Sequence, residues 1–122
     1  MSIVSPSDIF AKLAISLGDP AGIGPDIAIM NATQKSHAAL VHFADPILIE
    51  KRARELGIQI EITEIQNIET AHPVEPGLFQ IYPITNINTV ESGFSHPNNA
   101  EHILECLNSA LWHTTTGITD AL

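Results

Sequence analysis

AKLAISLGDPAGIGP, residues 11–25, is the stretch of sequence that decides the fold. Residues 11–17 form a short run with enough apolar side chains to make a buried strand. Residues 18–25 hold three glycines and two prolines, which preclude regular structure and end the strand. Pro25 suits the first turn of a helix and Asp26 suits its positive end, which predicts a helix over residues 26–32. The stretch thus predicts a strand, a tight turn and a helix.

A second strand and helix follow along the chain. The apolar run ALVHFA, residues 39–44, predicts a strand, and Asp45 followed by proline is typical of a helix start. The helix is expected over residues 47–56 and ends at Gly57, a residue free to adopt a positive φ. Residues 58–62 alternate apolar and polar side chains, which predicts a strand with one solvent-exposed face.

The order of segments predicts an α/β fold with a parallel or mixed sheet and flanking helices. Two more elements are expected, a strand over residues 77–84 and a helix over residues 99–112, and residues 118–122 resemble the opening of a further buried strand. Apolar spacing predicts which helix positions face the core. These positions are Ile27, Ile29 and Met30 in the first helix, Ile47, Leu48 and Leu56 in the second, and Ala100, Ile103, Leu104, Leu107 and Leu111 in the third.

Composition bounds the classes of protein to consider. The chain has 122 residues, enough for one domain, and residues 1–10 are expected to be a flexible lead-in. Five Lys and Arg against fourteen Asp and Glu give a net charge of −9, which argues against a nucleic-acid partner. No apolar run is long enough for a membrane span. The single cysteine and the lack of a basic region before an apolar core indicate a cytoplasmic protein.

The glycine-rich turn carries the clearest chemical signal. Between a strand and a helix, glycines allow backbone N–H groups to approach an anion. The turn lacks the Gly-Lys-Ser/Thr of a phosphate-binding loop, and Ile27 stands where a dinucleotide fingerprint needs its third glycine. A turn that binds nothing therefore stays open as an interpretation. Asp19 either lines a cofactor cleft or caps the turn, and Ile23 either contacts a cofactor or is buried against the sheet.

The histidines and the basic residues give weaker signals. His102 and Cys106 are four residues apart, so both could share one helix face, but a metal site needs more ligands than this pair. The expected arrangement is a partly buried thiol beside a surface imidazole. Lys51, Arg52 and Arg54 form either a phosphate patch or, as we expect, a solvated helix face.

The turn also carries a family resemblance. LGDPAGIGPD, residues 17–26, is similar to the N-terminal motif of 4-hydroxythreonine-4-phosphate dehydrogenases, and more loosely to the opening of isocitrate and isopropylmalate dehydrogenases. The similarity continues through residues 44–46, Gly77, and residues 97–100 leading into residues 103–107. It covers nearly all of the chain from Leu13 onward.

The resemblance implies that residues 1–122 are a single segment, the N-terminal portion of a longer two-domain dehydrogenase. Members of the family oxidise 4-phosphooxy-L-threonine to a 3-oxo acid that decarboxylates, in pyridoxal phosphate biosynthesis. They use NAD or NADP and a divalent metal (Zn, Mg or Co) held by three histidines, and they act as homodimers.

For this chain the resemblance implies a cofactor-binding set of Gly18, Asp19, Gly22 and Ile23. It implies no catalytic residue and no metal ligand, because the family's motifs for those roles follow the strand that residues 118–122 begin. We therefore expect the chain alone to be inactive and to bind no cofactor. The alternative is a repurposed, non-catalytic α/β interaction module.

Overall fold

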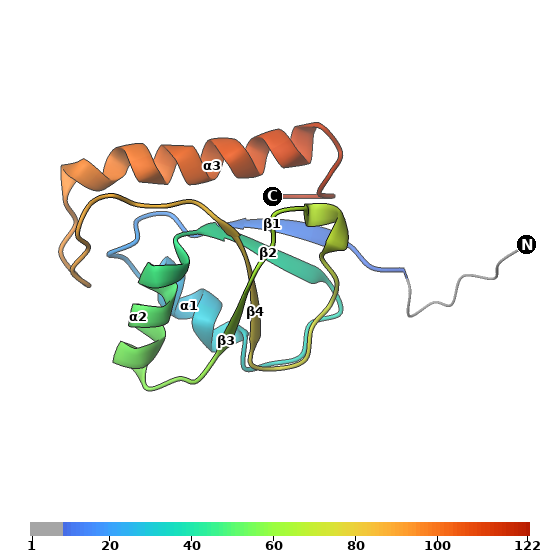
Figure 1. Cartoon of the computed structure of the whole chain (residues 1–122), viewed down its shortest axis with the longest axis horizontal. Helices are drawn as coiled ribbons and strands as arrows, with labels where there is room; N and C mark the ends of the chain where they lie inside the picture. The colour runs from blue at the N-terminus through green and yellow to red at the C-terminus, as the bar shows by residue number, and fades with distance from the viewer. Residues whose placement is uncertain (1–8) are drawn as a thin grey trace, which may run out of the picture.

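The computed structural model describes residues 9–122, so most of the expected lead-in lies outside the described residues. A four-stranded sheet lies between two helical layers, with α1 and α2 on one face and α3 along the other (Figure 1). In chain order the elements are β1 (Lys12–Ser16), α1 (Gly24–Asn31), β2 (Ala39–Ala44), α2 (Pro46–Leu56), β3 (Glu61–Glu64), the 3-10 turn η2 (Ile68–Thr70), β4 (Leu78–Pro83), the 3-10 turn η3 (Pro97–Asn99) and α3 (Ala100–Thr115).

The sheet has the order β1-β2-β4-β3, and each neighbouring pair of strands is parallel. This confirms the α/β fold and the parallel form of the sheet. The carboxyl ends of parallel strands meet at one edge, where ligands bind in many open α/β sheets. Here that edge carries the glycine-rich turn after β1 and Asp45 after β2.

The core has two parts, one on each face of the sheet. Towards α3 it contains Ala14, Ala39, Val41, Phe43, Ile65, Ile68, Ala71, Ile84, Cys106 and Ala110. Towards α1 and α2 it contains Ala28, Ile29, Ala44, Ile49, Ala53, Phe79 and Ile81. Strand side chains alternate between the faces, so Phe43 and Ala44, which are adjacent in β2, belong to different parts.

Most predicted elements are confirmed, with small shifts at their ends. β2 occupies the predicted residues, Asp45 caps α2 by accepting a 2.9 Å hydrogen bond from the Ile47 N–H, and Gly57 follows α2 with a φ of 69°. The alternating strand is displaced towards the carboxyl end, since β3 begins at Glu61 rather than Ile58.

The predicted buried faces of the first two helices are partly wrong. In α1 Ile29 is buried as expected, but Ile27 and Met30 are exposed. In α2 the buried residues are Ile49, Arg52 and Ala53; Ile47 is 72% exposed and Leu56 lies at the surface, with Leu48 half-buried. Both helices present to the sheet a face that differs from the one the largest apolar side chains suggest.

The predicted apolar stripe of α3 is also wrong as a core face. Leu104, Leu107 and Leu111 are exposed at 55%, 39% and 46%, together with Ala100, and Ile103 is half-buried. The face against the sheet is made of His102, Cys106, Ala110 and His113. Small residues allow the helix to lie close to β1 and β2, and the His113 ring packs 5.3 Å from Phe43 and 5.0 Å from Tyr82, centroid to centroid.

Residues 118–122 begin a fifth strand position beside β1. Ala121 forms a parallel bridge with Leu13, and Thr119 is buried at 1% exposure. The bridge confirms the expected opening of a strand. Ala121 and Leu122 are exposed, so these two residues are not buried as expected.

Candidate functional site

The turn after β1 is held by its own backbone and by Asp19. The Asp19 carboxylate accepts a 2.9 Å hydrogen bond from the Ala21 N–H, and its other oxygen accepts one of 2.7 Å from the Ser95 hydroxyl. The Gly22 N–H donates to the Asp19 carbonyl at 2.9 Å. These bonds confirm the capping interpretation of Asp19, and they use N–H groups that an anion would need.

Glycine is required at Gly24 because the chain approaches itself there. A Cβ added at this position would overlap the Leu17 carbonyl at the end of β1. The start of α1 is therefore packed directly against the end of the strand before it, which makes the bend between the two elements sharp.

Arg52 of α2 holds the turn in place through hydrogen bonds. The sequence did not predict this role. Its guanidinium donates to the Pro20 carbonyl at 2.7 Å, the Gly22 carbonyl at 2.9 Å and the Asp26 carboxylate at 2.6 Å. The side chain is 7% exposed, so the solvated-face prediction is wrong for Arg52. The sequence signal that could have predicted the burial of Arg52 is its position between Ile49 and Ala53, which share the buried face of the helix.

The other two cations of that cluster have separate partners. Lys51 donates to the Val90 carbonyl at 3.1 Å, while Arg54, 71% exposed, lies 3.8 Å from Glu50. The three basic side chains do not converge on one point, so they form no phosphate patch.

A groove runs beside the turn, between the start of α1, the end of α2 and the loop over residues 92–95. We call it the turn groove. Its volume is about 490 Å³, within the range of small-molecule sites. It is lined by Asp19, Ala21, Gly22, Ile23, Asp26, Arg52, Glu55, Leu56, Ser92, Gly93 and Ser95.

Three of the predicted cofactor-binding residues therefore meet in one place. Asp19, Gly22 and Ile23 line the turn groove, whereas Gly18 lines a different, smaller hollow. Ile23 is 71% exposed, so the alternative that buries it against the sheet is wrong. Its side chain is available to contact a ligand in the groove.

The charge of the turn groove limits what can bind there. Carboxylates of Asp19, Asp26 and Glu55 line it, and the guanidinium of Arg52 is already bonded to the turn. The two prolines of the turn supply no N–H group. These features disfavour a phosphate or pyrophosphate and suit an uncharged ligand group with apolar and hydroxyl surface.

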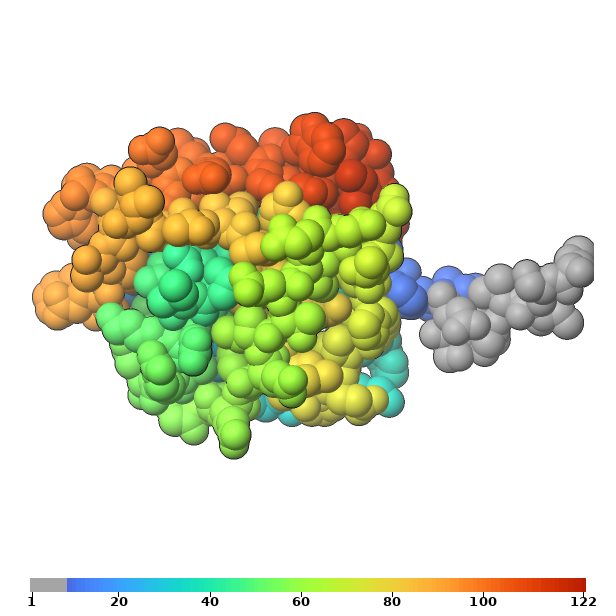
Figure 2. Space-filling view, viewed as in Figure 1, coloured from blue at the N-terminus to red at the C-terminus, as the bar shows by residue number. Residues whose placement is uncertain are grey.

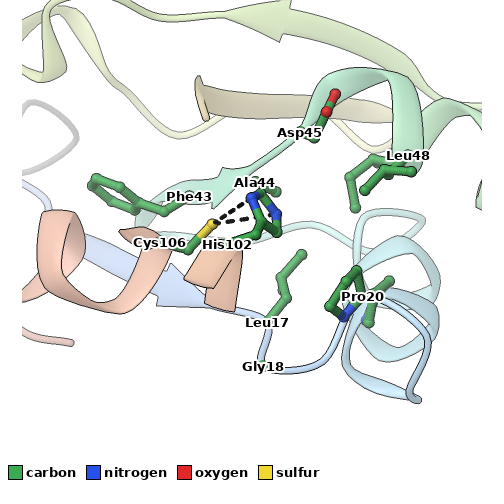
Figure 3. Close-up of a pocket in the computed structure, with 11 residues that line it drawn as sticks. Leu17, Gly18, Pro20, Phe43, Ala44, Asp45, Leu48, His102 and Cys106 are labelled. Atoms are coloured by element: carbon green, nitrogen blue, oxygen red, sulfur yellow. Dashed lines mark hydrogen bonds between the residues drawn. The ribbon is translucent and has the colours of Figure 1, made fainter. Parts of the chain in front are cut away.

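The smaller hollow lies at the carboxyl ends of β1 and β2 (Figure 3). Its lining includes Leu17, Gly18, Asp45, His102 and Cys106, and its volume of about 20 Å³ has room for a water molecule but not for a cofactor. We call it the buried hollow.

His102 and Cys106 are adjacent in the buried hollow, with the sulfur 3.6 Å from Nε2 of the imidazole. Both residues are buried, so the expected surface imidazole is wrong and the shared helix face is confirmed. Burial raises the pKa of the Cys106 thiol to about 12, with the nearby carboxylates of Glu105 and Asp45 contributing in the same direction. Burial also lowers the pKa of His102, against the opposing effect of the same carboxylates. The pair is thus a neutral imidazole beside an unreactive thiol.

The histidines do not assemble a metal centre in the described part of the chain. His42 is buried in the sheet, where its ring stacks on Phe79 at 3.9 Å and its Nδ1 lies 2.9 Å from the Gln80 carbonyl. Within residues 9–122 no group of three His, Cys, Asp or Glu side chains is placed to hold an ion. These residues therefore do not by themselves fit the metal that the resemblance implies.

No protein-family model matches the chain. It is 32% identical over 111 residues to the 4-hydroxythreonine-4-phosphate dehydrogenase of Methylococcus capsulatus, and 36% identical over 112 residues to that of Pseudoalteromonas atlantica. Each match covers 91% of this chain and 34% of the relative, so the chain spans about a third of the length of these curated relatives.

Solved structures of the same enzyme share the fold. The enzyme from Burkholderia phymatum superposes with a TM-score of 0.81 at 16% identity, over 91% of this chain and 34% of that one. The enzyme from Klebsiella pneumoniae gives a TM-score of 0.77 at 18% identity, over 89% of this chain and 35% of that one.

The fold and the turn define an α/β unit of the kind that binds small ligands at the carboxyl ends of its parallel strands. The sequence matches define it more narrowly. Over most of its own length, the chain is homologous to the 4-hydroxythreonine-4-phosphate dehydrogenases. Among residues 9–122, no helix is both long enough and apolar enough to cross a membrane.

Proposed function

We propose that this chain forms the glycine-turn portion of an NAD- or NADP-dependent dehydrogenase that oxidises 4-phosphooxy-L-threonine in pyridoxal phosphate biosynthesis. The observation that carries the proposal is identity of 32–36% to 4-hydroxythreonine-4-phosphate dehydrogenases across 91% of the chain. The shared fold supports it, with a TM-score of 0.81.

The turn groove supports a role on the nicotinamide side of the cofactor. Ile23 offers an exposed apolar surface, and the hydroxyls of Ser92 and Ser95 line the same groove. When bound, the cofactor would supply hydride acceptance. The part of this chain is to position the nicotinamide ring or its ribose against Ile23 and Gly22, while the pyrophosphate lies away from the carboxylates of the groove.

We expect the chain by itself to be inactive. The family resemblance assigns the metal-binding histidines and the substrate-binding residues to motifs outside the matching stretch. The homodimer and the divalent metal that the resemblance implies are likewise proposed for a protein of the relatives' full length.

A chimeric enzyme tests the proposal. This chain replaces the matching segment of the Methylococcus capsulatus enzyme, and reduction of NAD and NADP is followed with 4-phosphooxy-L-threonine and a divalent metal present. The control chimera carries the corresponding segment of the Pseudoalteromonas atlantica enzyme, which shows whether the junctions are tolerated. We expect both chimeras to reduce the cofactor. A control that is active beside a folded but inactive chimera of this chain contradicts the proposal.

A second candidate is a non-catalytic interaction module. The exposed leucines of α3 support it, because a contiguous apolar helix face is typical of a surface that another polypeptide covers. In that case the chain would be folded and monodisperse with a specific partner, and the chimera would be inactive.

A further inference from the structure

The turn groove presents more negative than positive charge to a ligand. Carboxylates of Asp19, Asp26 and Glu55 line it, and Arg52 is the one cation among the lining residues of the described chain. The Arg52 side chain is 7% exposed, so little of its charge is presented to the groove. The groove therefore attracts a cation for the same reason that it disfavours a phosphate.

Two of the three carboxylates are already paired with cations. The Asp26 carboxylate lies 2.6 Å from the guanidinium of Arg52. The carboxylate of Glu55 lies 3.6 Å from Nε of Arg52 and 3.9 Å from Nζ of Lys51. These ion pairs offset much of the negative charge that Asp26 and Glu55 bring to the groove.

Asp19 is the carboxylate that no cation offsets. No Lys, Arg or His side chain of residues 9–122 lies within 4 Å of its oxygens. The two oxygens accept hydrogen bonds from neutral donors, the Ala21 N–H at 2.9 Å and the Ser95 hydroxyl at 2.7 Å. Neutral donors fix the orientation of a carboxylate and leave its net charge in place, so the uncompensated charge of the groove lies at Asp19.

The turn places this charge beside the surface proposed for the nicotinamide ring. The Gly22 N–H donates to the Asp19 carbonyl at 2.9 Å, which closes the turn between these two residues. Ile23 follows Gly22 directly, is 71% exposed and lines the same groove as Asp19. A ring that packs on Ile23 and Gly22 therefore lies close to the Asp19 carboxylate.

The two redox forms of a nicotinamide cofactor differ in charge at this ring. The oxidised ring is a cationic pyridinium, and it becomes neutral when it accepts a hydride. The phosphates carry the same charge in both forms. A carboxylate beside the ring therefore stabilises the oxidised form and has little effect on the reduced form.

We propose that Asp19 is a specificity-determining residue, whose negative charge shifts binding towards the oxidised form of the nicotinamide cofactor. The inference rests on the proposed function, because it requires the nicotinamide ring to lie against Ile23 and Gly22. It goes beyond that function by naming the side chain that distinguishes the two redox forms. Weaker binding of the reduced form also favours its release after hydride transfer.

The chimera built on the Methylococcus capsulatus enzyme allows this preference to be measured as binding. Dissociation constants of the oxidised and the reduced cofactor are measured by titration calorimetry without substrate, so no turnover is needed. We expect Asp19→Asn to raise the constant for the oxidised form about fivefold and to change that for the reduced form less than about twofold. Asparagine keeps an acceptor for the Ala21 N–H and a polar partner for Ser95, so the turn is retained.

Two substitutions and a salt series supply the controls. Ser95→Ala removes the hydrogen bond to Asp19 and keeps the charge, so it should keep the preference for the oxidised form. Glu50→Gln removes an exposed carboxylate of α2 that does not line the groove, and should change neither constant. In the unsubstituted chimera, the ratio of the constant for the reduced form to that for the oxidised form should fall as salt rises, because ions screen exposed charges.

Four results would overturn the inference while the proposed function stands. They are an unchanged ratio of the two constants in a folded Asp19→Asn chimera, an equal loss of affinity for both forms, the same shift in Glu50→Gln, and a ratio in the unsubstituted chimera that does not change with salt. The equal loss would assign Asp19 to the shape of the turn alone. A chimera that binds neither form would refute the proposed function and the inference with it, so the two failures are distinguishable.

Discussion

Arg52 shows how a single charged residue can organise the candidate site. Three groups of the turn and of α1 accept its hydrogen bonds, and its side chain is almost completely buried. The Asp26 carboxylate is 29% exposed, so the pair lies at the boundary between core and solvent. The shape of the glycine-rich turn thus depends on a helix that follows it by about thirty residues, Arg52 and Gly22 being thirty positions apart.

We expect Arg52→Ala to lower the free energy of unfolding by about 3 kcal/mol, because it leaves two carbonyls and a carboxylate without their donor. Arg54→Ala is the matched control on the same helix. Arg54 is 71% exposed and its ion pair with Glu50 measures 3.8 Å, so a loss of about 0.5 kcal/mol or less is expected. Urea denaturation of both variants measures the difference. Equal losses would show that Arg52 does not clamp the turn.

His42 makes stability depend on pH. Burial lowers its pKa from 6.5 to about 4, against the weaker effect of the Gln80 carbonyl. The unfolded chain therefore binds more protons than the folded chain between pH 6.5 and pH 4. The contribution is complete above pH 6.5, decreases as the pH falls below 6.5, and is fully lost once the pH has fallen through 4.

At pH 5 we expect the chain to have lost about 2 kcal/mol of stability through His42 relative to pH 7.5. His42→Gln should remove this part of the loss, whereas the exposed His37→Gln should leave it in place. Urea unfolding at the two pH values measures it. The same loss in His42→Gln as in the original chain would contradict the assignment.

At the scale of elements, the segments could be predicted from the sequence but their orientations could not. The glycine-rich turn, the cap at Asp45 and Gly57 are local signals, and each was found where predicted. Which face of a helix meets the sheet depends on the residues that oppose it. In α3 the sheet face under the helix already carries Phe43, so small residues and flat rings fit there better than leucines.

In the candidate site, too, local features could be predicted from the sequence and long-range contacts could not. That Asp19, Gly22 and Ile23 lie beside one groove could be predicted because they belong to one motif, and their role in binding a cofactor stays a prediction. The role of Arg52 could not be predicted, because it depends on a contact between distant segments and because arginine side chains are usually solvated. The long-range hydrogen bond between Ser95 and Asp19 could not be predicted from local patterns either.

The close approach of Gly24 to the Leu17 carbonyl can be tested by substitution. We expect Gly24→Ala to lower the free energy of unfolding by more than about 2 kcal/mol, because the added methyl group meets the Leu17 carbonyl and the two elements must separate. Gly18→Ala is the comparison, since Gly18 has a φ of 72° and open space around it, and should cost about 1 kcal/mol. Thermal or urea unfolding measures both. A smaller loss for Gly24→Ala than for Gly18→Ala would refute the close approach.

At the scale of the whole molecule, α3 forms a continuous band along one side of the surface (Figure 2). Its outward leucines, Leu104, Leu107 and Leu111, follow one another at helical spacing. Ile23, which precedes α1, forms a second exposed apolar row with Ile27 and Met30 of α1. A surface with two such rows is expected to bind hydrophobic dyes or to self-associate.

We expect the double variant Leu104→Lys and Leu111→Lys to reduce dye binding and self-association at least severalfold, with a change in stability below about 1 kcal/mol. Both leucines face away from the sheet, so no core contact is lost. Ala110→Lys, on the opposite face and fully buried, should instead unfold the chain. Light scattering and dye fluorescence give the readout. Dye binding that does not fall in the double variant would show that the dye binds at another surface, such as the apolar row of Ile23, Ile27 and Met30.

The most direct measurement of the central claim is the Michaelis constant for the nicotinamide cofactor in the active chimera. Ile23→Ala should raise the KM for NAD or NADP about five- to tenfold, through loss of an apolar contact of about 1 kcal/mol, and leave the KM for the phosphorylated substrate unchanged. Ile27→Ala, one turn further along α1, should change neither constant. An Ile23→Ala chimera with both constants unchanged, or with only the substrate constant raised, would show that the glycine-rich turn does not serve the cofactor.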